Sequence, residues 1–363
     1  LSRGKAEVED DLGLAHYRVG VIAEEVGSPG EALPSYEKAR EIQAVLLQGQ
    51  PSSPQRLRAL GDTWNAIGRA YGKQQRLEDA RKAFKEAIKV RERLGQLRPP
   101  PPDGQRLLAN SYMNLGLLDQ EGSPEQARNW LLEAERLRRR ARGASPEEDF
   151  RLRRDRALGL CNLGALDLAR GKLDDSAQAL KQAQTLLSRL TTTNAADLCS
   201  RYQLAVCRRL LADVRSIQEC RDVARRLYDQ AREEMQTLKE KNPSVPEYQL
   251  ALAEIYINMA QSEFEQGRRS AAVAAFEQAQ QLLERLVAGA AENARYRGDL
   301  IVTLRAVAVL HPEATRREGA RQALQVVRVR LREISQNSPD ARDVNEQLQQ
   351  VEEALEMPPA APP

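Results

Sequence analysis

The chain has 363 residues, of which 41% are hydrophobic and 29% charged, and 55 Lys and Arg against 52 Asp and Glu give a formal net charge of +3. This composition can bury a core and excludes a membrane protein, and it argues against wholesale disorder. The near-neutral balance argues against a dedicated nucleic-acid protein, for which a striped basic excess is expected. Aromatic residues are only 4% of the chain, so helices are favoured over strands.

The sequence carries no sign of a membrane or secretory segment. There is no run of about 18 apolar residues, and no signal-like segment follows Leu1. Because the sequence begins at Leu1 rather than at Met, we interpret the chain as a piece of a longer polypeptide or a processed product. The cysteines form no CxxC pair, which favours a reduced, cytoplasmic location.

A small residue recurs every 48 positions, and this is the strongest pattern in the sequence. Twelve residues later comes a second small residue, and four residues after that a bulky one; the third unit keeps this order one residue early, which implies a one-residue deletion. Such spacings place the residues on one helix face, where small side chains let two helices approach closely. Each unit therefore predicts a helical hairpin. The recurring small residues are Gly20, Gly68, Gly116, Gly164, Ala212, Ala260 and Ala308.

The hairpins follow one another along the chain with regular punctuation. Turns are expected at residues 27–30, 72–74, 122–124, 171–172, 267–268 and 311–312, and Pro-containing breaks at 51–54, 99–102, 145–146, 243–246 and 338–339. Residues 191–196 and 289–293 replace such breaks before the fifth and seventh units. A further helix at 341–356 is expected to cap the array, and the Pro/Ala tail 358–363 to be disordered. We predict one solenoid domain over residues 1–357.

The second unit resembles the tetratricopeptide repeat family nearly letter for letter, and the other units keep its small and bulky positions. The matching residues are Trp64, Ile67, Gly68, Tyr71, Ala80, Phe84 and Ala87. The resemblance implies an all-α, right-handed α-α superhelix of seven helical hairpins plus a C-terminal capping helix. The family repeat has 34 residues, so the longer unit predicts helices of about 20 residues and about 30 Å.

The long units and Pro-rich breaks also look like the repeat arrays that accompany serine/threonine kinase domains in planctomycete-type bacteria. None of the kinase sequence signature is present in this sequence, so kinase activity is not carried over from that resemblance.

In tetratricopeptide arrays the first helix of each hairpin lines a concave groove, and the resemblance implies contact positions there. Asn recurs two residues before the recurring small residue, as Asn114, Asn162 and Asn258, and Asn65 lies beside the same position in the second unit. An amide both donates and accepts, so a ladder of Asn suits the backbone of any extended peptide; the alternative is that each Asn bonds the neighbouring helix. Three of the residues also make part of the family's carboxylate clamp: Asn65, Arg69 and Asn110. The full set of peptide-binding candidates is Asn65, Arg69, Asn110, Asn114, Asn162, Asn258 and Gln261.

Arginines gather between residues 136 and 156, interrupted by acids at 147–149. Such a cluster suits RNA, a phosphorylated segment or an acidic partner, but it is more typical of a solvated ridge. Because aromatic residues do not regularly alternate with these arginines, nucleic-acid binding is the weaker interpretation.

Catalytic and metal-binding constellations are missing from the sequence. The only histidines, His16 and His311, belong to the first and seventh units, and the glycines form no phosphate loop. We therefore expect no enzymatic activity, no metal and no cofactor. The prediction is a non-catalytic scaffold that binds a protein or peptide partner in its groove. The alternatives are a regulatory or substrate-recruiting arm of a bacterial kinase, and self-association through the end repeats.

Overall fold

The computed structural model describes residues 3–26, 29–143, 145–291, 293–337 and 342–357. Within those ranges the protein forms fifteen α-helices and no strand, which confirms the predicted all-α fold of helical hairpins. The helices are α1 (Arg3–Val26), α2 (Pro29–Gly49), α3 (Pro54–Lys73), α4 (Leu77–Gln96), α5 (Gly104–Leu118), α6 (Pro124–Arg140), α7 (Pro146–Ala169), α8 (Leu173–Thr193), α9 (Leu198–Ile217), α10 (Arg221–Lys241), α11 (Pro246–Glu265), α12 (Arg269–Gly289), α13 (Ala294–Leu310), α14 (Ala314–Asn337) and α15 (Arg342–Glu356).

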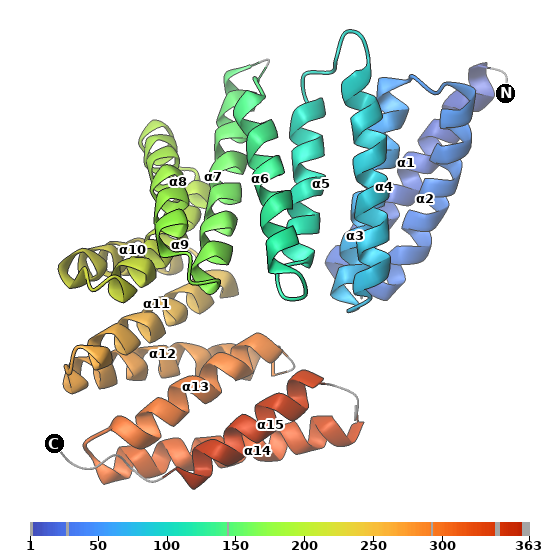
Figure 1. Cartoon of the computed structure of the whole chain (residues 1–363). Helices are drawn as coiled ribbons and strands as arrows, with labels where there is room; N and C mark the ends of the chain where they lie inside the picture. Colours follow the sequence, from blue (N-terminus) through green and yellow to red (C-terminus); the bar gives the residue numbers. More distant parts are fainter. Residues whose placement is uncertain (1–2, 27–28, 144, 292, 338–341, 358–363) are drawn as a thin grey trace. The chain divides into compact units, whose positions relative to one another are not determined.

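The protein divides into two compact units, residues 1–190 and 191–363. In the first unit, successive helices from α1 to α7 pack against one another, and α1, α3, α5 and α7 also contact one another in that order. Figure 1 shows these helices standing side by side. The first helices of successive hairpins therefore lie next to one another, as the candidate site requires.

The second unit repeats this arrangement from α9 to α14, with α9, α11 and α13 in contact as first helices. The last helix, α15, packs against both α13 and α14, as a capping helix does. The proposed single domain over residues 1–357 stays a prediction, and the tail 358–363 lies outside the described residues.

The recurring small residues mark where the two helices of a hairpin approach most closely. At Gly20 in α1, a Cβ atom would lie 2.6 Å from two ring carbons of Tyr36 in α2. Ala212, Ala260 and Ala308 take the same place in the second unit and are buried. Neighbour-only burial of this kind is how a repeat array builds its core.

Helix boundaries follow local capping chemistry. Ser53 caps α3 by accepting a hydrogen bond from the Arg56 backbone N–H, and Pro54 occupies the first turn. Most helices have 20 to 24 residues, close to the predicted length, but α5 has only 15. It is shorter because the run of prolines at 99–102 delays its start to Gly104.

Candidate functional site

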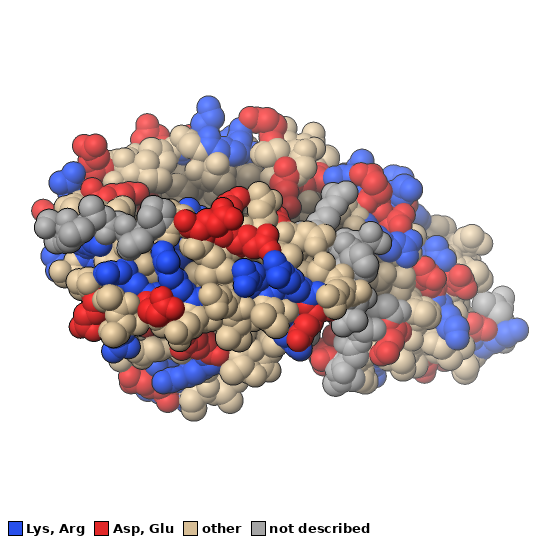
Figure 2. All heavy atoms as spheres, turned by 90° about the horizontal axis from the view of Figure 1, so that it is seen from below, with Lys and Arg blue, Asp and Glu red and all other residues tan. Residues whose placement is uncertain are grey.

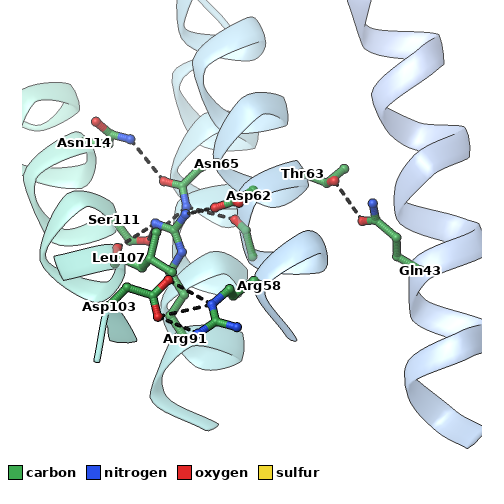
Figure 3. Close-up of polar contacts among 11 residues, drawn as sticks. Gln43, Arg58, Asp62, Thr63, Asn65, Arg91, Asp103, Leu107, Ser111 and Asn114 are labelled. Carbon is green, nitrogen blue, oxygen red and sulfur yellow. Dashed lines mark hydrogen bonds and ion pairs between the residues drawn. The ribbon is translucent and has the colours of Figure 1, made fainter. Parts of the chain in front are cut away.

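Asn65 joins two neighbouring first helices. Its side chain is only 3% exposed, and its Nδ2 donates to Gly61 O at 3.0 Å within α3 and to Ser111 Oγ at 2.9 Å in α5. Its Oδ1 accepts from Asn114 Nδ2 at 3.1 Å (Figure 3). Asn65 thus bonds the adjacent helix, as in the alternative interpretation, and holds Asn114 in place.

Four of the seven predicted residues line one open cavity of ≈ 270 Å³ in the first unit: Asn65, Arg69, Asn110 and Asn114. Its wall is completed by Arg91, Met113, Arg138, Asp155 and Leu158. The cavity thus joins groups from α3, α4, α5, α6 and α7. An amide-rich and cationic lining of this kind can donate hydrogen bonds to backbone carbonyl and carboxylate oxygens.

The other three predicted residues lie elsewhere. Asn162 is half-buried on α7, and within the described part of the protein its side chain makes no hydrogen bond. Asn258, on α11 of the second unit, donates at 3.0 Å to both carboxylate oxygens of Asp213. Gln261 is exposed on the same helix. Asn258 is therefore hydrogen-bonded to a neighbouring first helix. The amides of Asn162 and Gln261 form no such hydrogen bond among the described residues.

The charged side chains of the cavity differ in how well they are neutralised. Arg91 is 4% exposed and forms an ion pair with Asp62 at 2.6 Å (Figure 3). Arg69 is 44% exposed, and its Nη2 lies 3.6 Å from a carboxylate oxygen of Glu24. Arg138 is 3% exposed, although its sequence neighbours suggested a solvated ridge. The 48-residue register, which aligns Arg138 with Arg91, was the signal that could have identified it.

A second polar cluster surrounds Asp213 in the second unit. Tyr228 Oη donates to Asp213 Oδ1 at 2.6 Å, and Arg209 Nη1 lies 3.1 Å from Oδ2. Burial raises the pKa of the Asp213 carboxyl, and burial likewise raises the pKa of the Tyr228 hydroxyl. Because Asn258 also bonds Asp213, this cluster ties three helices together and leaves little capacity for a ligand.

Metal and membrane chemistry find no support in the residues that the structure describes. No group of three or more His, Cys, Asp or Glu side chains among them is placed to hold a metal ion. None of the helices over those ranges is long and apolar enough to cross a membrane. On the face seen in Figure 2, acidic and basic side chains are interspersed, and neither sign covers a continuous area.

These features define a class of protein: an array of antiparallel helical hairpins whose first helices form the candidate surface. The tetratricopeptide repeat model matches residues 61–93 and 253–282, one segment in each unit. These two segments therefore match tetratricopeptide repeats, and such repeats suggest a protein-interaction scaffold.

Solved structures have the same kind of fold. The protein is similar to BtubC (BKLC) from P. vanneervenii, with 19% identity and a TM-score of 0.55 over 71% of this chain and 92% of that one. It is also similar to the S. pombe nuclear import adaptor Nro1, with 14% identity and a TM-score of 0.50 over 82% of this chain and 99% of that one. At these identities the likeness shows the fold alone. No curated protein is significantly similar to this sequence.

Proposed function

We propose that the first unit binds an extended segment of a protein partner across α3, α5 and α7. The observation that carries this proposal is the cavity in which Asn65, Arg69, Asn110 and Asn114 meet. These four side chains come from α3 and α5, so a single bound segment would touch successive hairpins. The role of the protein is then recruitment of the partner rather than chemistry.

The individual amides support different parts of this role. Asn65 is buried and uses its polar atoms within the protein, so we assign it to positioning. Asn114 uses one N–H on Asn65 and keeps its Oδ1 and a second N–H for a peptide backbone. Asn162, one repeat further along, supplies the next step of the ladder. Because backbone groups are common to all peptides, affinity from these amides depends little on sequence.

The test is selection of linear peptides from a random displayed library on the purified protein. Selected peptides should lose affinity by about tenfold for Asn114→Ala and Asn162→Ala together, since each variant removes about one peptide hydrogen bond. Gln236→Ala, an exposed amide on α10, is the matched control and should bind as the unmodified protein does. Failure to enrich any peptide, or equal affinity for all variants with unchanged helical circular dichroism, would contradict the proposal.

Nucleic-acid binding is less well supported. Arg156 and Arg136, from the basic run, lie within ion-pair distance of Glu135 and Glu133, at 2.8 and 3.4 Å. Arg138 is buried. The basic run is therefore partly neutralised by its own acids and does not offer a uniform positive surface. A role as the recruiting arm of a bacterial kinase stays a prediction from the resemblance of the long units.

A further inference from the structure

The outer face of α1 carries an apolar stripe that no other described part of the chain covers. The stripe consists of Val8, Leu12, Ala15, Val19 and Ile22. Their spacing of three and four residues places them on one side of the helix. The four large side chains are 45–67% exposed, and Ala15 is exposed between them. Among the described helices α1 contacts only α2 and α3, which pack on its other side. A continuous exposed apolar face of this kind marks an interaction surface.

One repeat further along the chain, the same face of the first helix is a buried junction between hairpins. The residues of α3 that correspond to positions 12, 15, 19 and 22 are Leu60, Thr63, Ile67 and Ala70. All four are at most 6% exposed, because α3 packs against α1 and α2 of the preceding hairpin. The stripe on α1 therefore has the apolar character of a junction, but it faces solvent.

The junctions inside the first unit also contain a polar pair that the α1 face lacks. Thr63 Oγ1 donates to Gln43 Oε1 of the preceding second helix at 2.8 Å (Figure 3). At the next junction Arg91 Nη1 donates at 2.7 Å to Ser111 Oγ, and Ser111 corresponds to Thr63 in the repeat. In α1 this position is Ala15, which has no hydroxyl group. The centre of the α1 face is therefore apolar and is not matched to a hairpin of this polar type.

Two opposite charges lie along one edge of the stripe. Asp11 and Arg18 are exposed and seven residues apart, so they share one side of the helix. Neither forms an ion pair with another residue that the structure describes. In α3 the corresponding residues are Ala59 and Ala66, and neither carries a charge. With its acid in one half of the helix and its base in the other, this edge is complementary to a second copy of itself that runs in the opposite direction.

An antiparallel pair of α1 helices satisfies both the stripe and the charges. A two-fold axis between residues 13 and 14 places Leu12 opposite Ala15 of the second copy, so that a large side chain packs on a small one. Asp11 then lies two residues, about 3 Å along the helix axis, from Arg18 of the second copy, and the two-fold axis repeats this pair. In a parallel pair Asp11 and Arg18 would be seven residues, about 10 Å, apart along the axis.

We propose that two copies of this chain associate through the stripe, with the two α1 helices antiparallel. The apolar side chains are buried between the helices, and Asp11 and Arg18 form two equivalent ion pairs along one edge. Because a two-fold interface uses the same surface of both copies, association stops at the dimer. In the last hairpin α15 packs against both α13 and α14 as a cap, and for the first hairpin the second copy supplies the corresponding cover. This inference does not depend on the proposed function.

The first experiment is sedimentation velocity on the full chain over a range of micromolar concentrations. We expect a dimer that dissociates on dilution. Val19→Glu places two charges in the apolar interface and should weaken the dimer by about a hundredfold or more. Val45→Glu is the matched control: Val45 is exposed on α2, and its equivalent Arg93 stays exposed in α4 with hairpins on both sides, so position 45 lies off the stripe. A monomer at every concentration, or a dimer that Val19→Glu leaves unchanged, would overturn the proposal.

A charge exchange tests the antiparallel arrangement. Asp11→Arg and Arg18→Asp each replace two attractive pairs by two repulsive ones, and each variant alone should dimerise about tenfold more weakly. An equimolar mixture of the two variants should recover the dimer, because the Arg introduced at position 11 of one chain then faces the Asp introduced at position 18 of the other. Both positions are exposed, so helical circular dichroism should stay unchanged. A mixture that dimerises no better than either variant alone would overturn this arrangement.

Discussion

Two glycines in the same helix should respond to alanine in opposite ways. Gly13 and Gly20 both lie inside α1, so Gly→Ala gives each the same gain in helix propensity, about 1 kcal/mol. At Gly13 the new Cβ would meet its nearest neighbours, Gln43 and Ile42, at 3.4 Å, which is ordinary contact. Gly13→Ala should therefore stabilise the first unit by about 1 kcal/mol.

At Gly20 the new methyl group would lie 2.6 Å from two ring carbons of Tyr36. The ring is fully buried, and its hydroxyl donates to Glu24 at 2.8 Å, so it cannot move aside easily. Overpacking of this kind costs about 1–3 kcal/mol. Because the propensity gain is common to both variants, Gly20→Ala should be about 1–3 kcal/mol less stable than Gly13→Ala.

The measurement is urea unfolding followed by tryptophan fluorescence. Both tryptophans of the protein, Trp64 and Trp130, lie in the first unit, so the signal reports that unit alone. The variants should give midpoints on opposite sides of the unmodified protein, or at least separated in the stated order, with unchanged slopes. Equal midpoints would show that α1 and α2 do not pack as closely as the structure indicates.

Three further changes follow from buried or capping groups. Replacing Arg138 by Met should stabilise the first unit by about 1–3 kcal/mol in the absence of ligand, because it removes buried donors that have no partner among the described residues. Urea unfolding midpoints would measure the change, and a loss of stability would contradict the prediction. Burial, with the nearby Glu254 carboxylate, raises the pKa of Asp299 from 3.8 to about 6. The folded protein then holds a proton that the unfolded protein has released, so its stability should fall as pH rises from 3.8 through about 6. Amide hydrogen exchange of α13 would measure this fall in stability, which should be smaller in Asp299→Asn. An identical fall in the variant would refute the prediction. The Asn293 side chain accepts from the backbone N–H groups of Arg295 and Tyr296, so Asn293→Ala should cost about 1 kcal/mol, measured as faster exchange in the first turn of α13.

The fold was largely predictable because its core residues recur at regular positions in the sequence and are of two distinct kinds, small and bulky. A small residue such as Gly68 and a bulky one such as Phe84 meet in each of the first four hairpins, and the same spacing recurs in the later units. Helix ends were harder where prolines cluster, as before α5. The division at residue 190 leaves no mark in the spacing, because the 48-residue register continues through it.

The candidate site was predictable only in part. The spacing placed Asn65, Asn110 and Asn114 on neighbouring first helices, and they do meet in one cavity. The spacing did not distinguish Asn65, whose amide is hydrogen-bonded within the protein, from Asn114, which is available to a ligand. Burial depends on which side chains of the neighbouring helices face each residue. Arg138 was missed for the same reason. Its side chain contacts Asn110 and lies over Gly159, which are 28 residues before it and 21 after it in the sequence.

The polar junctions of the first unit have a consequence for how its hairpins are ordered. Gln43 meets Thr63 and Arg91 meets Ser111, so each pair is matched across one boundary only. A hairpin moved to another place in the sequence would bury a mismatched polar group, at a cost of about 1–3 kcal/mol. In the second unit Met235, Leu283 and Leu331 occupy the equivalent positions, and apolar contacts accept many neighbours. We therefore expect this position to restrict the order of the first three hairpins. In the second unit it imposes no such restriction, and the polar match between neighbouring hairpins lies instead between Asp213 and Asn258.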